Sequence, residues 1–201
     1  MGFLTDYEEN YVEYEGGKVE LDLSYDSVLN AKRVFGDDNL DNSMKILTAL
    51  EILVCSKKIL ARLTWQEKQQ LLETIFEEKI ASKERVSTKP SAVPLLDFEL
   101  DGEYIYASFL QDYQLDLIDA QGKLSWKRFL ALMQGLSDKT KMKEVINIRA
   151  MELPEPNGRN GKIRQNIMEL KSHYALPVRG GGGKDGLDRL FDTLEAQAIR
   201  R

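Results

Sequence analysis

Residues 42–80 read NSMKILTALEILVCSKKILARLTWQEKQQLLETIFEEKI, and this stretch decides the fold. Its apolar residues do not alternate with polar ones, as they would along a half-buried strand, but recur at helical spacing. We therefore predict one long, largely buried helix over 42–63. Thr64 and Glu67 then match a capping box, in which each side chain accepts a backbone N–H at the start of a new helix. The pattern predicts two successive helices in a mainly α protein.

The sequence before this stretch alternates apolar and charged residues in two short runs, 11–15 and 18–22, on either side of Gly16 and Gly17. This spacing is typical of a β-hairpin with a two-residue turn, because glycine adopts positive φ without strain. A short helix is predicted next, with Ser24 as its cap. We expect an N-terminal β-hairpin that leads directly into helical structure.

The sequence after residue 80 changes to a stretch rich in serine and proline, 83–97, which we interpret as an internal linker. Apolar periodicity then predicts four more helices, at about 104–113, 126–135 (capped by Ser125), 137–151 and 162–174. Residues 178–201 contain four consecutive glycines followed by an amphipathic segment. The predicted fold is mainly α: an N-terminal β-hairpin and a multi-helix bundle in residues 1–177, and a tethered C-terminal amphipathic helix in 178–201.

Composition limits the classes of protein that fit. The 201 residues carry 28 basic and 33 acidic side chains, so the net charge of −5 provides no overall cationic field for nucleic acid or an anionic membrane. The longest apolar runs are far shorter than the roughly 20 residues of a membrane-spanning helix. The N-terminus turns acidic before an apolar signal region could form. We expect a cytosolic protein that binds neither nucleic acid nor membranes.

The sequence contains no recognisable catalytic or metal-binding pattern. His173 is the only histidine and Cys55 the only cysteine, which excludes a multi-histidine metal cage. We interpret Cys55 as a small packing residue on an apolar helix, and His173 as a surface residue near a helix end. The run 180–184 lacks the Ser or Thr that a phosphate-binding loop places after its lysine. We expect no cofactor, no metal and no enzymatic activity; the remaining enzymatic alternative is a carboxylate site that the sequence does not single out.

Candidate binding residues are apolar side chains at helical spacing near the C-terminus. The face that they would form consists of Leu187, Leu190, Phe191 and Leu194. This face either docks on a partner or folds back onto the protein's own core, and both readings stay open. Two aromatic residues are weaker candidates: Trp65, at the first position after a cap, and Tyr106, off the main aromatic stripe. For Trp65, a role as a packing anchor is equally open.

One block of sequence is specific enough to suggest a family. Residues 101–113 (DGEYIYASFLQDY), 115–117 (LDL) and 124–136 (LSWKRFLALMQGL) together resemble the bacteriophage "gene product fifteen" family. The resemblance extends over roughly residues 3–177. Members of this family resemble tail assembly chaperones of long-tailed phages.

The resemblance implies a function in protein binding. It implies a helix-rich protein that binds the tape measure protein and the tail tube protein during tail assembly, with no catalytic residue. It also implies activity in the host cytoplasm and absence from the mature virion; self-association stays open. The alternative is a structural tail or connector component that remains in the virion. Two residues depart from the family pattern: Ser125 stands where histidine is common, and Gln114 where glycine is common.

In such phages the chaperone is often made in a short form and a frameshifted long form. Codons for Gly182, Gly183 and Lys184 are compatible with a ribosomal slip of one base. A plain glycine linker is the simpler interpretation of the same residues.

Overall fold

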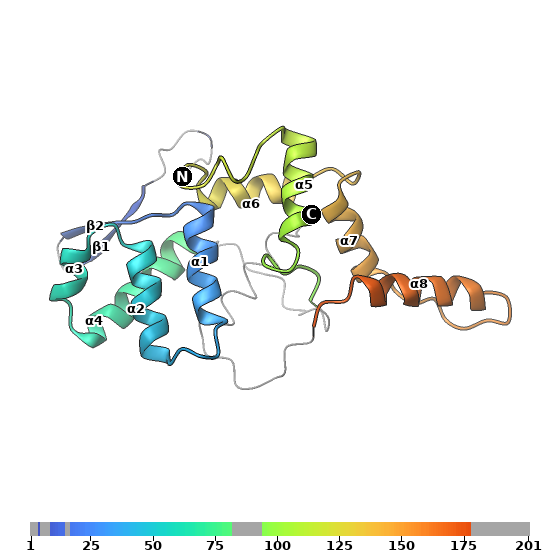
Figure 1. Cartoon of the computed structure of the whole chain (residues 1–201), viewed down its shortest axis with the longest axis horizontal. Coiled ribbons are helices and arrows are strands. Elements are labelled where there is room, and N and C mark those ends of the chain that lie inside the picture. The colour runs from blue at the N-terminus through green and yellow to red at the C-terminus, as the bar shows by residue number, and fades with distance from the viewer. Residues whose placement is uncertain (1–3, 5–8, 15–16, 82–93, 178–201) are drawn as a thin grey trace. The chain divides into compact units, whose positions relative to one another are not determined.

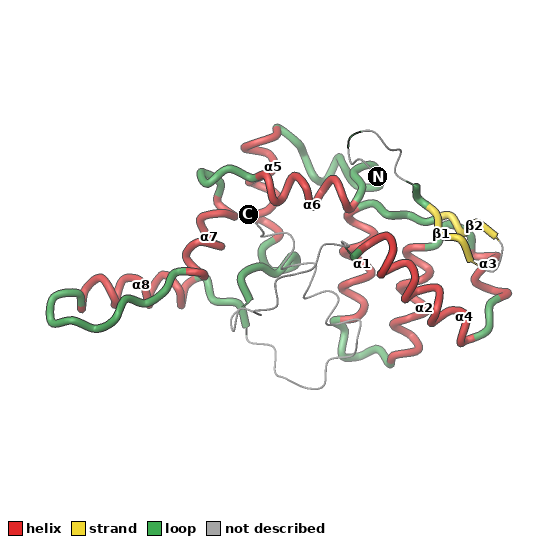
Figure 2. Tube along the Cα trace, turned by 180° about the vertical axis from the view of Figure 1, so that it is seen from behind, coloured by secondary structure: helices red, strands yellow, loops and turns green. Residues whose placement is uncertain are grey.

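A computed structural model describes residue 4 and residues 9–14, 17–81 and 94–177 (Figure 1). The chain forms two compact units that are not two consecutive parts of the sequence. The first unit contains residues 1–83 and 121–127, and the second contains 84–120 and 128–201. Among the described residues, helices dominate both units and an N-terminal hairpin supplies the strands, which confirms the predicted mainly α fold (Figure 2). The predicted C-terminal amphipathic helix in 178–201 lies outside the described residues.

The hairpin consists of β1 (Tyr11–Tyr14) and β2 (Gly17–Glu20), paired antiparallel. Val12 lies opposite Val19, and both side chains are buried. Because side chains alternate between the two faces of a strand, this register places both valines on the core side. Gly17 pairs with Tyr14 and therefore opens β2, whereas the sequence had placed it in the turn.

Helix α1 (Tyr25–Phe35) begins after Ser24, but the Ser24 hydroxyl makes no capping hydrogen bond, so this part of the prediction is wrong. The Asp22 carboxylate organises the helix start instead. It accepts hydrogen bonds from the Ser24 backbone N–H at 3.0 Å and from the Ser27 hydroxyl at 2.8 Å. Asp22 thus holds the residue before α1 and the Ser27 side chain in its first turn, without capping a backbone N–H of the helix.

The predicted helix over 42–63 is in fact two helices, α2 (Asn42–Leu53) and α3 (Lys57–Arg62). The interruption lies where the backbone pairs with the chain that leaves β2. The Leu53 carbonyl accepts the Asp22 N–H at 2.8 Å, and the Cys55 N–H donates to the Glu20 carbonyl at 3.0 Å. These bonds replace helical ones, because a backbone N–H or C=O that pairs with a neighbouring segment is no longer free for the helix.

Helix α4 (Trp65–Ile75) begins with the predicted capping box, which the structure confirms. The Thr64 hydroxyl accepts the Glu67 N–H at 3.4 Å, and the Glu67 carboxylate accepts the Thr64 N–H at 2.5 Å. The helix continues as a π-helical turn, η1 (Phe76–Ile80). Phe76 is fully buried, and its ring packs edge-on against Phe35 with centroids 6.3 Å apart.

Residues 121–127 complete the first unit although they are distant from it in sequence. Trp126 is buried, and its indole N–H donates to the Ile80 carbonyl at 3.3 Å. The Trp126 backbone N–H donates to the Leu23 carbonyl at 2.8 Å, and the Tyr25 N–H donates to the Leu124 carbonyl at 2.9 Å. The Ser125 hydroxyl is buried with no hydrogen-bond partner, so its predicted capping role is wrong.

The second unit contains α5 (Gly102–Tyr113), α6 (Trp126–Gly135) from Arg128 onward, α7 (Lys141–Ala150) and α8 (Gly161–His173). Its core contains three aromatic side chains that pack together. The Phe129 ring stacks on Phe109 at 5.3 Å and lies 5.9 Å from Phe98. All three side chains are buried.

Candidate functional site

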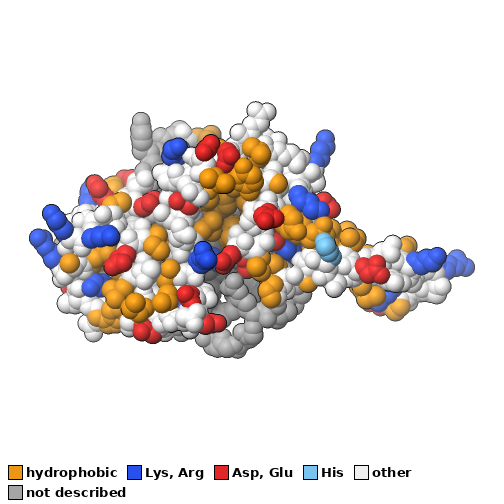
Figure 3. Space-filling view, viewed as in Figure 1, with side chains coloured by type: hydrophobic (Ala, Val, Ile, Leu, Met, Phe, Trp, Pro, Cys, Tyr) orange, Lys and Arg blue, Asp and Glu red, His pale blue; other side chains and the backbone are white. Residues whose placement is uncertain are grey.

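Helix α8 differs from the other helices of the second unit because none of its residues is buried. Ile163, Ile167 and Leu170 recur at positions i, i+4 and i+7, so they share one side of the helix. Ile163 is 58% exposed and Leu170 is 43% exposed, whereas Ile167 is half-buried. We call these three residues the α8 face. Figure 3 shows hydrophobic side chains at the surface along α8, between charged ones.

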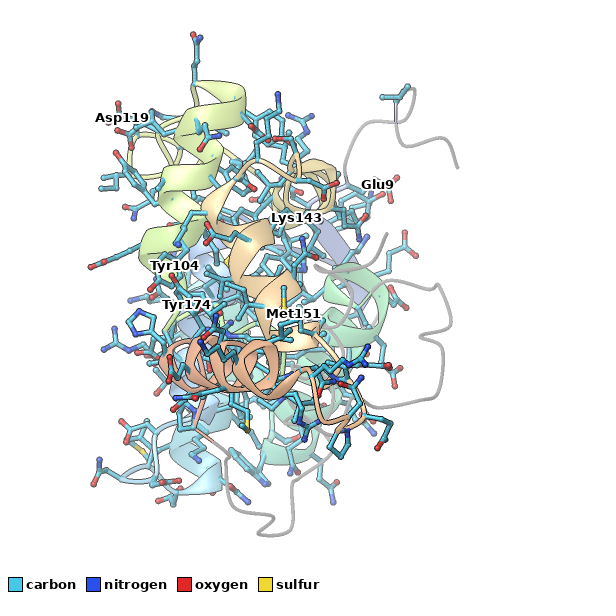
Figure 4. The ribbon with its side chains drawn as sticks, turned by 90° about the vertical axis from the view of Figure 1, so that its right-hand side faces the viewer. Glu9, Tyr104, Asp119, Lys143, Met151 and Tyr174 are labelled. Carbon is cyan, nitrogen blue, oxygen red and sulfur yellow. The ribbon has the colours of Figure 1, made fainter. Side chains whose placement is uncertain are left out.

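The C-terminal end of α8 is anchored to α7. The Lys171 ammonium donates hydrogen bonds to the carbonyls of Arg149, at 2.8 Å, and Met151. The Tyr174 carbonyl accepts from Arg149 Nε at 2.7 Å, and the Tyr174 ring packs edge-on against Tyr104 (Figure 4). Because these bonds hold one end of the helix, the α8 face keeps a defined orientation in its unit.

The other end of α8 is held by the loop that leads into it. Arg164 donates a hydrogen bond to the Pro154 carbonyl, and the Asn160 side chain donates to the Glu155 carbonyl at 2.9 Å. Both bonds connect the start of α8 with the loop that precedes it. Figures 1 and 2 both show α8 extending away from α5 and α7 within the second unit. The α8 face is therefore accessible among the described residues.

A buried ion pair stabilises the end of α7, to which α8 is anchored. Arg149 Nη1 and Nη2 donate to the two carboxylate oxygens of Asp101, at 2.6 and 2.7 Å, and the two side chains are 5% and 1% exposed. Arg149 also donates to the Leu95 carbonyl at 3.0 Å. One side chain thus links the start of α5 to the end of α7 and, through Tyr174, to the end of α8. Sequence reasoning missed this pair; the only signal was an arginine among the apolar positions of a helix.

Two of the predicted binding residues lie in described parts of the chain, but in different units. Trp65 is the first residue of α4 and is 39% exposed. Tyr106 is half-buried on α5, and its hydroxyl donates to the Asp116 carboxylate at 3.0 Å. That hydrogen bond, together with burial and the charge of Asp116, raises the pKa of Tyr106. Leu187, Leu190, Phe191 and Leu194 lie outside the described residues.

Cys55 and His173 were considered above as catalytic or metal-binding residues. Among the described residues, neither lies in a cluster of such side chains. Cys55 is exposed between α2 and α3, which corrects its expected place on a buried helix face. Partial burial, followed by the nearby charges of Asp22 and Glu20, raises the pKa of the Cys55 thiol and so disfavours the reactive thiolate. His173 ends α8 at the surface, as predicted, with its ring 4.7 Å from that of Tyr174.

The described residues form no obvious centre for small-molecule chemistry. A pocket of about 170 Å³ between Leu47, Leu60 and Lys68 is small for a substrate-sized ligand. Within the described ranges, no group of three His, Cys, Asp or Glu side chains is placed to hold a metal ion. Among the same residues, no helix has the length and apolar character needed to cross a membrane. The α8 face is therefore the strongest candidate site.

Comparison with known families adds an independent observation. The sequence profile of a family described as Bacteriophage Gp15 protein matches residues 4–176, which is most of the 201-residue chain. The chain belongs to the bacteriophage Gp15 protein family. No curated protein and no solved structure matches it.

The part of the chain that matches the Gp15 family contains both α8 and the ion pair at the end of α7. The Asp101–Arg149 ion pair and the whole of α8 lie inside residues 4–176. The match ends at Leu176, whose side chain is buried, and the glycine run and the C-terminal segment lie beyond it. The α8 face is thus part of the region that matches the Gp15 family, whereas the C-terminal segment lies outside it.

Proposed function

We propose that this Gp15 family protein is a phage tail assembly chaperone that binds the tape measure protein and tail tube subunits during tail assembly. It acts in the host cytoplasm, leaves before the virion is mature, and neither catalyses a reaction nor needs a cofactor. The observation that carries the proposal is the α8 face, a row of apolar side chains on an anchored helix, of which Ile163 and Leu170 are exposed and Ile167 is half-buried. Family membership supplies the phage context.

The α8 face suits the work of shielding another helical chain. A tape measure protein is a very long, helix-prone chain with apolar stripes, which would self-associate if they were left uncovered. An exposed apolar helix face can cover such a stripe by packing against it. A few moderate apolar contacts also permit release when the tube replaces the chaperone, because affinity is set mainly by the dissociation rate.

Co-expression with the tape measure protein of the same phage tests the proposal. We expect the tape measure protein to stay soluble and to co-purify with the unsubstituted chain. We expect Ile163→Glu to abolish co-purification, because it places a charge in the apolar contact. Met168→Glu is the matched control: it also replaces an exposed apolar side chain by glutamate, but on another side of α8.

Two results would contradict the proposal. If the tape measure protein aggregates equally with and without this chain, the chaperone function is wrong. If both substitutions leave binding intact, the α8 face is not the site. Mass analysis of purified virions tests the alternative that the protein is a structural tail or connector component. A component that remains in the virion would be found there in stoichiometric amounts.

A further inference from the structure

A pocket of about 170 Å³ lies between α2, α3 and α4 in the first unit, and we call it the α2–α4 pocket. Its apolar lining consists of Leu47, Leu50, Leu60 and Ala61. Leu50 and Leu60 are buried, whereas Leu47 is half-buried and Ala61 is exposed, so the apolar lining reaches the surface. Small-molecule sites usually measure on the order of 300–1,000 Å³. The α2–α4 pocket therefore suits one large side chain better than a whole small-molecule ligand.

Exposed apolar side chains continue this lining on two of the three helices. Met44 precedes Leu47 by three residues on α2, and Trp65 precedes Lys68 by three residues on α4. Residues three apart are neighbours on the surface of a helix, and both Met44 and Trp65 are exposed. Figure 3 shows hydrophobic side chains at the surface over α2. Apolar surface that borders a pocket in this way is typical of a site where another protein binds.

The charged groups at the α2–α4 pocket are mostly basic. Lys57 and Lys68 line it, together with the acidic residue Glu51. Among the described residues, neither lysine forms an ion pair or a side-chain hydrogen bond. Helix α3 adds the exposed cations of Lys58 and Arg62 and contains no acidic residue. On a chain with a net charge of −5, this basic surface is a local exception.

The apolar lining and the basic rim together define a partner. We infer that the α2–α4 pocket binds a segment of another protein in which one large apolar side chain is flanked by carboxylates. The apolar side chain fills the pocket, and the carboxylates lie against Lys57 and Lys68. Burial of the side chain provides affinity, while the opposite charges select the partner and speed its association. The inference concerns the first unit and does not rest on the proposed function.

Binding of a labelled peptide to the full chain tests the inference. The probe is a short fluorescein-labelled peptide whose central leucine is flanked by glutamates on both sides, and fluorescence anisotropy measures its Kd. Replacing the central leucine by alanine should raise Kd at least about tenfold, because most of the buried apolar area is lost. Replacing the glutamates by lysines should weaken binding by a similar factor, because like charges then face each other.

A pair of substitutions in the full chain locates the bound side chain. Ala61→Phe fills the α2–α4 pocket from an exposed position, so it should abolish binding of the probe while the fold is kept. Thermal unfolding checks that the fold is kept. Ala107→Phe is the matched control, because it places the same side chain at an exposed alanine of α5, and it should leave Kd unchanged.

The charged rim gives a second set of variants that leaves the apolar lining intact. At physiological salt, Lys57→Gln should raise the Kd of the probe by about threefold. Lys58→Gln is the matched control: this exposed lysine is the next residue of α3 but does not line the pocket, so Kd should stay nearly unchanged. Glu51→Gln should lower Kd by about threefold, because it removes a carboxylate that repels those of the probe.

Each other explanation gives a distinct result. Equal binding of the leucine and alanine peptides would mean that charge alone attracts the probe, which overturns the inference. Binding that survives Ala61→Phe, or equal effects of Lys57→Gln and Lys58→Gln, would also overturn it. So would a dimer of the full chain in light scattering that only Ala61→Phe dissociates, because a second copy would then fill the pocket. Ile163→Glu should leave probe binding intact, so this inference and the proposal for the α8 face can fail independently.

Discussion

Gln114 has a backbone conformation that normally belongs to glycine. It follows α5 with φ of 52°, in the left-handed region, and among the described residues it alone has positive φ without being glycine. A side chain in this region costs about 1 kcal/mol, which glycine avoids. Gln114 therefore carries a backbone strain that glycine at the same position would not have.

We expect Gln114→Gly to raise the free energy of unfolding by about 0.5–1 kcal/mol, because the substitution removes this strain at a helix end. Urea denaturation followed by circular dichroism measures the change. Gly122→Ala is the comparison: φ is 68° there and the space around it is open, so only backbone strain acts. A loss of about 1 kcal/mol is expected for it. A destabilised Gln114→Gly would contradict this account.

The Asp22 carboxylate contributes stability that depends on pH. Burial opposes its ionisation, but the hydrogen bonds from Ser24 and Ser27 outweigh burial and hold the pKa of Asp22 below its usual value. Because the pKa is lower in the folded protein, the contribution is complete above the ordinary carboxyl pKa and is lost as pH falls through the lowered value.

Asp22→Asn should therefore cost about 0.5–1 kcal/mol at pH 7, a modest amount because the carboxylate is only half-buried. The difference from the unsubstituted chain should shrink as pH falls below about 4. Unfolding measured from pH 7 to pH 3 checks both statements. Asp38→Asn, at an exposed position, removes the same charge and serves as the control. A gap that stays constant with pH would refute the assignment.

At the scale of elements, the ends of α5 and α7 are joined by Asp101 and Arg149. Both charges are almost completely buried, so removing one partner leaves the other without compensation in a poorly solvating environment. We expect Asp101→Leu and Arg149→Met each to cost about 3–5 kcal/mol. Arg149→Lys should also destabilise, because lysine cannot bond both carboxylate oxygens in the same planar geometry.

The double variant decides whether the cost comes from the pair. Asp101→Leu combined with Arg149→Met removes both charges, so it should be clearly more stable than the sum of the single losses implies. Thermal unfolding of the four proteins gives the coupling free energy. Additive losses would mean that each side chain matters through its own packing and not through the ion pair.

The helices differ in how well their interactions could be predicted from the sequence. The capping box of Thr64 and Glu67 was correct because all its atoms lie within one turn of helix. The break between α2 and α3 was missed because its cause is distant: the backbone of Leu53 and Cys55 pairs with Asp22, just after the hairpin, and with Glu20, the last residue of β2. Arg149 was missed for the same reason, since its partner lies in another helix. The amphipathic pattern of α8 was recognised, but a pattern does not reveal whether its apolar side finds a neighbour.

At the scale of the whole molecule, the first unit depends on residues that follow part of the second. Trp126 fills a buried position in the first unit and bonds the carbonyl at the end of η1. The sequence predicted an internal linker at 83–97 within one helical domain of residues 1–177, whereas the structure divides the chain into two units near Lys83. The sequence did not predict that residues 121–127 belong to the first unit, because the apolar pattern at the start of a helix does not show in which unit the helix packs.

We therefore expect a fragment of residues 1–83 to be much less stable than the same unit in the full chain. Losing a buried tryptophan alone costs about 3–5 kcal/mol, and the backbone bonds to Leu23 and Tyr25 are lost with it. Thermal unfolding by circular dichroism compares the fragment with the full chain. Trp126→Ala in the full chain is the control and should reproduce most of the loss. A fragment that unfolds cooperatively at the midpoint of the full chain would contradict the prediction.

The first unit is built from two separate stretches of the sequence, and this limits which recombination events between such genes give a folded protein. A crossover between two related phages that falls inside codons 84–120 would unite the first 83 residues of one parent with the Trp126 of the other. Hybrids of this kind inherit a mismatched core and not two intact modules. Viable exchanges should therefore cluster outside that window, so comparing breakpoints among co-infecting strains would read the architecture of this unit directly from DNA.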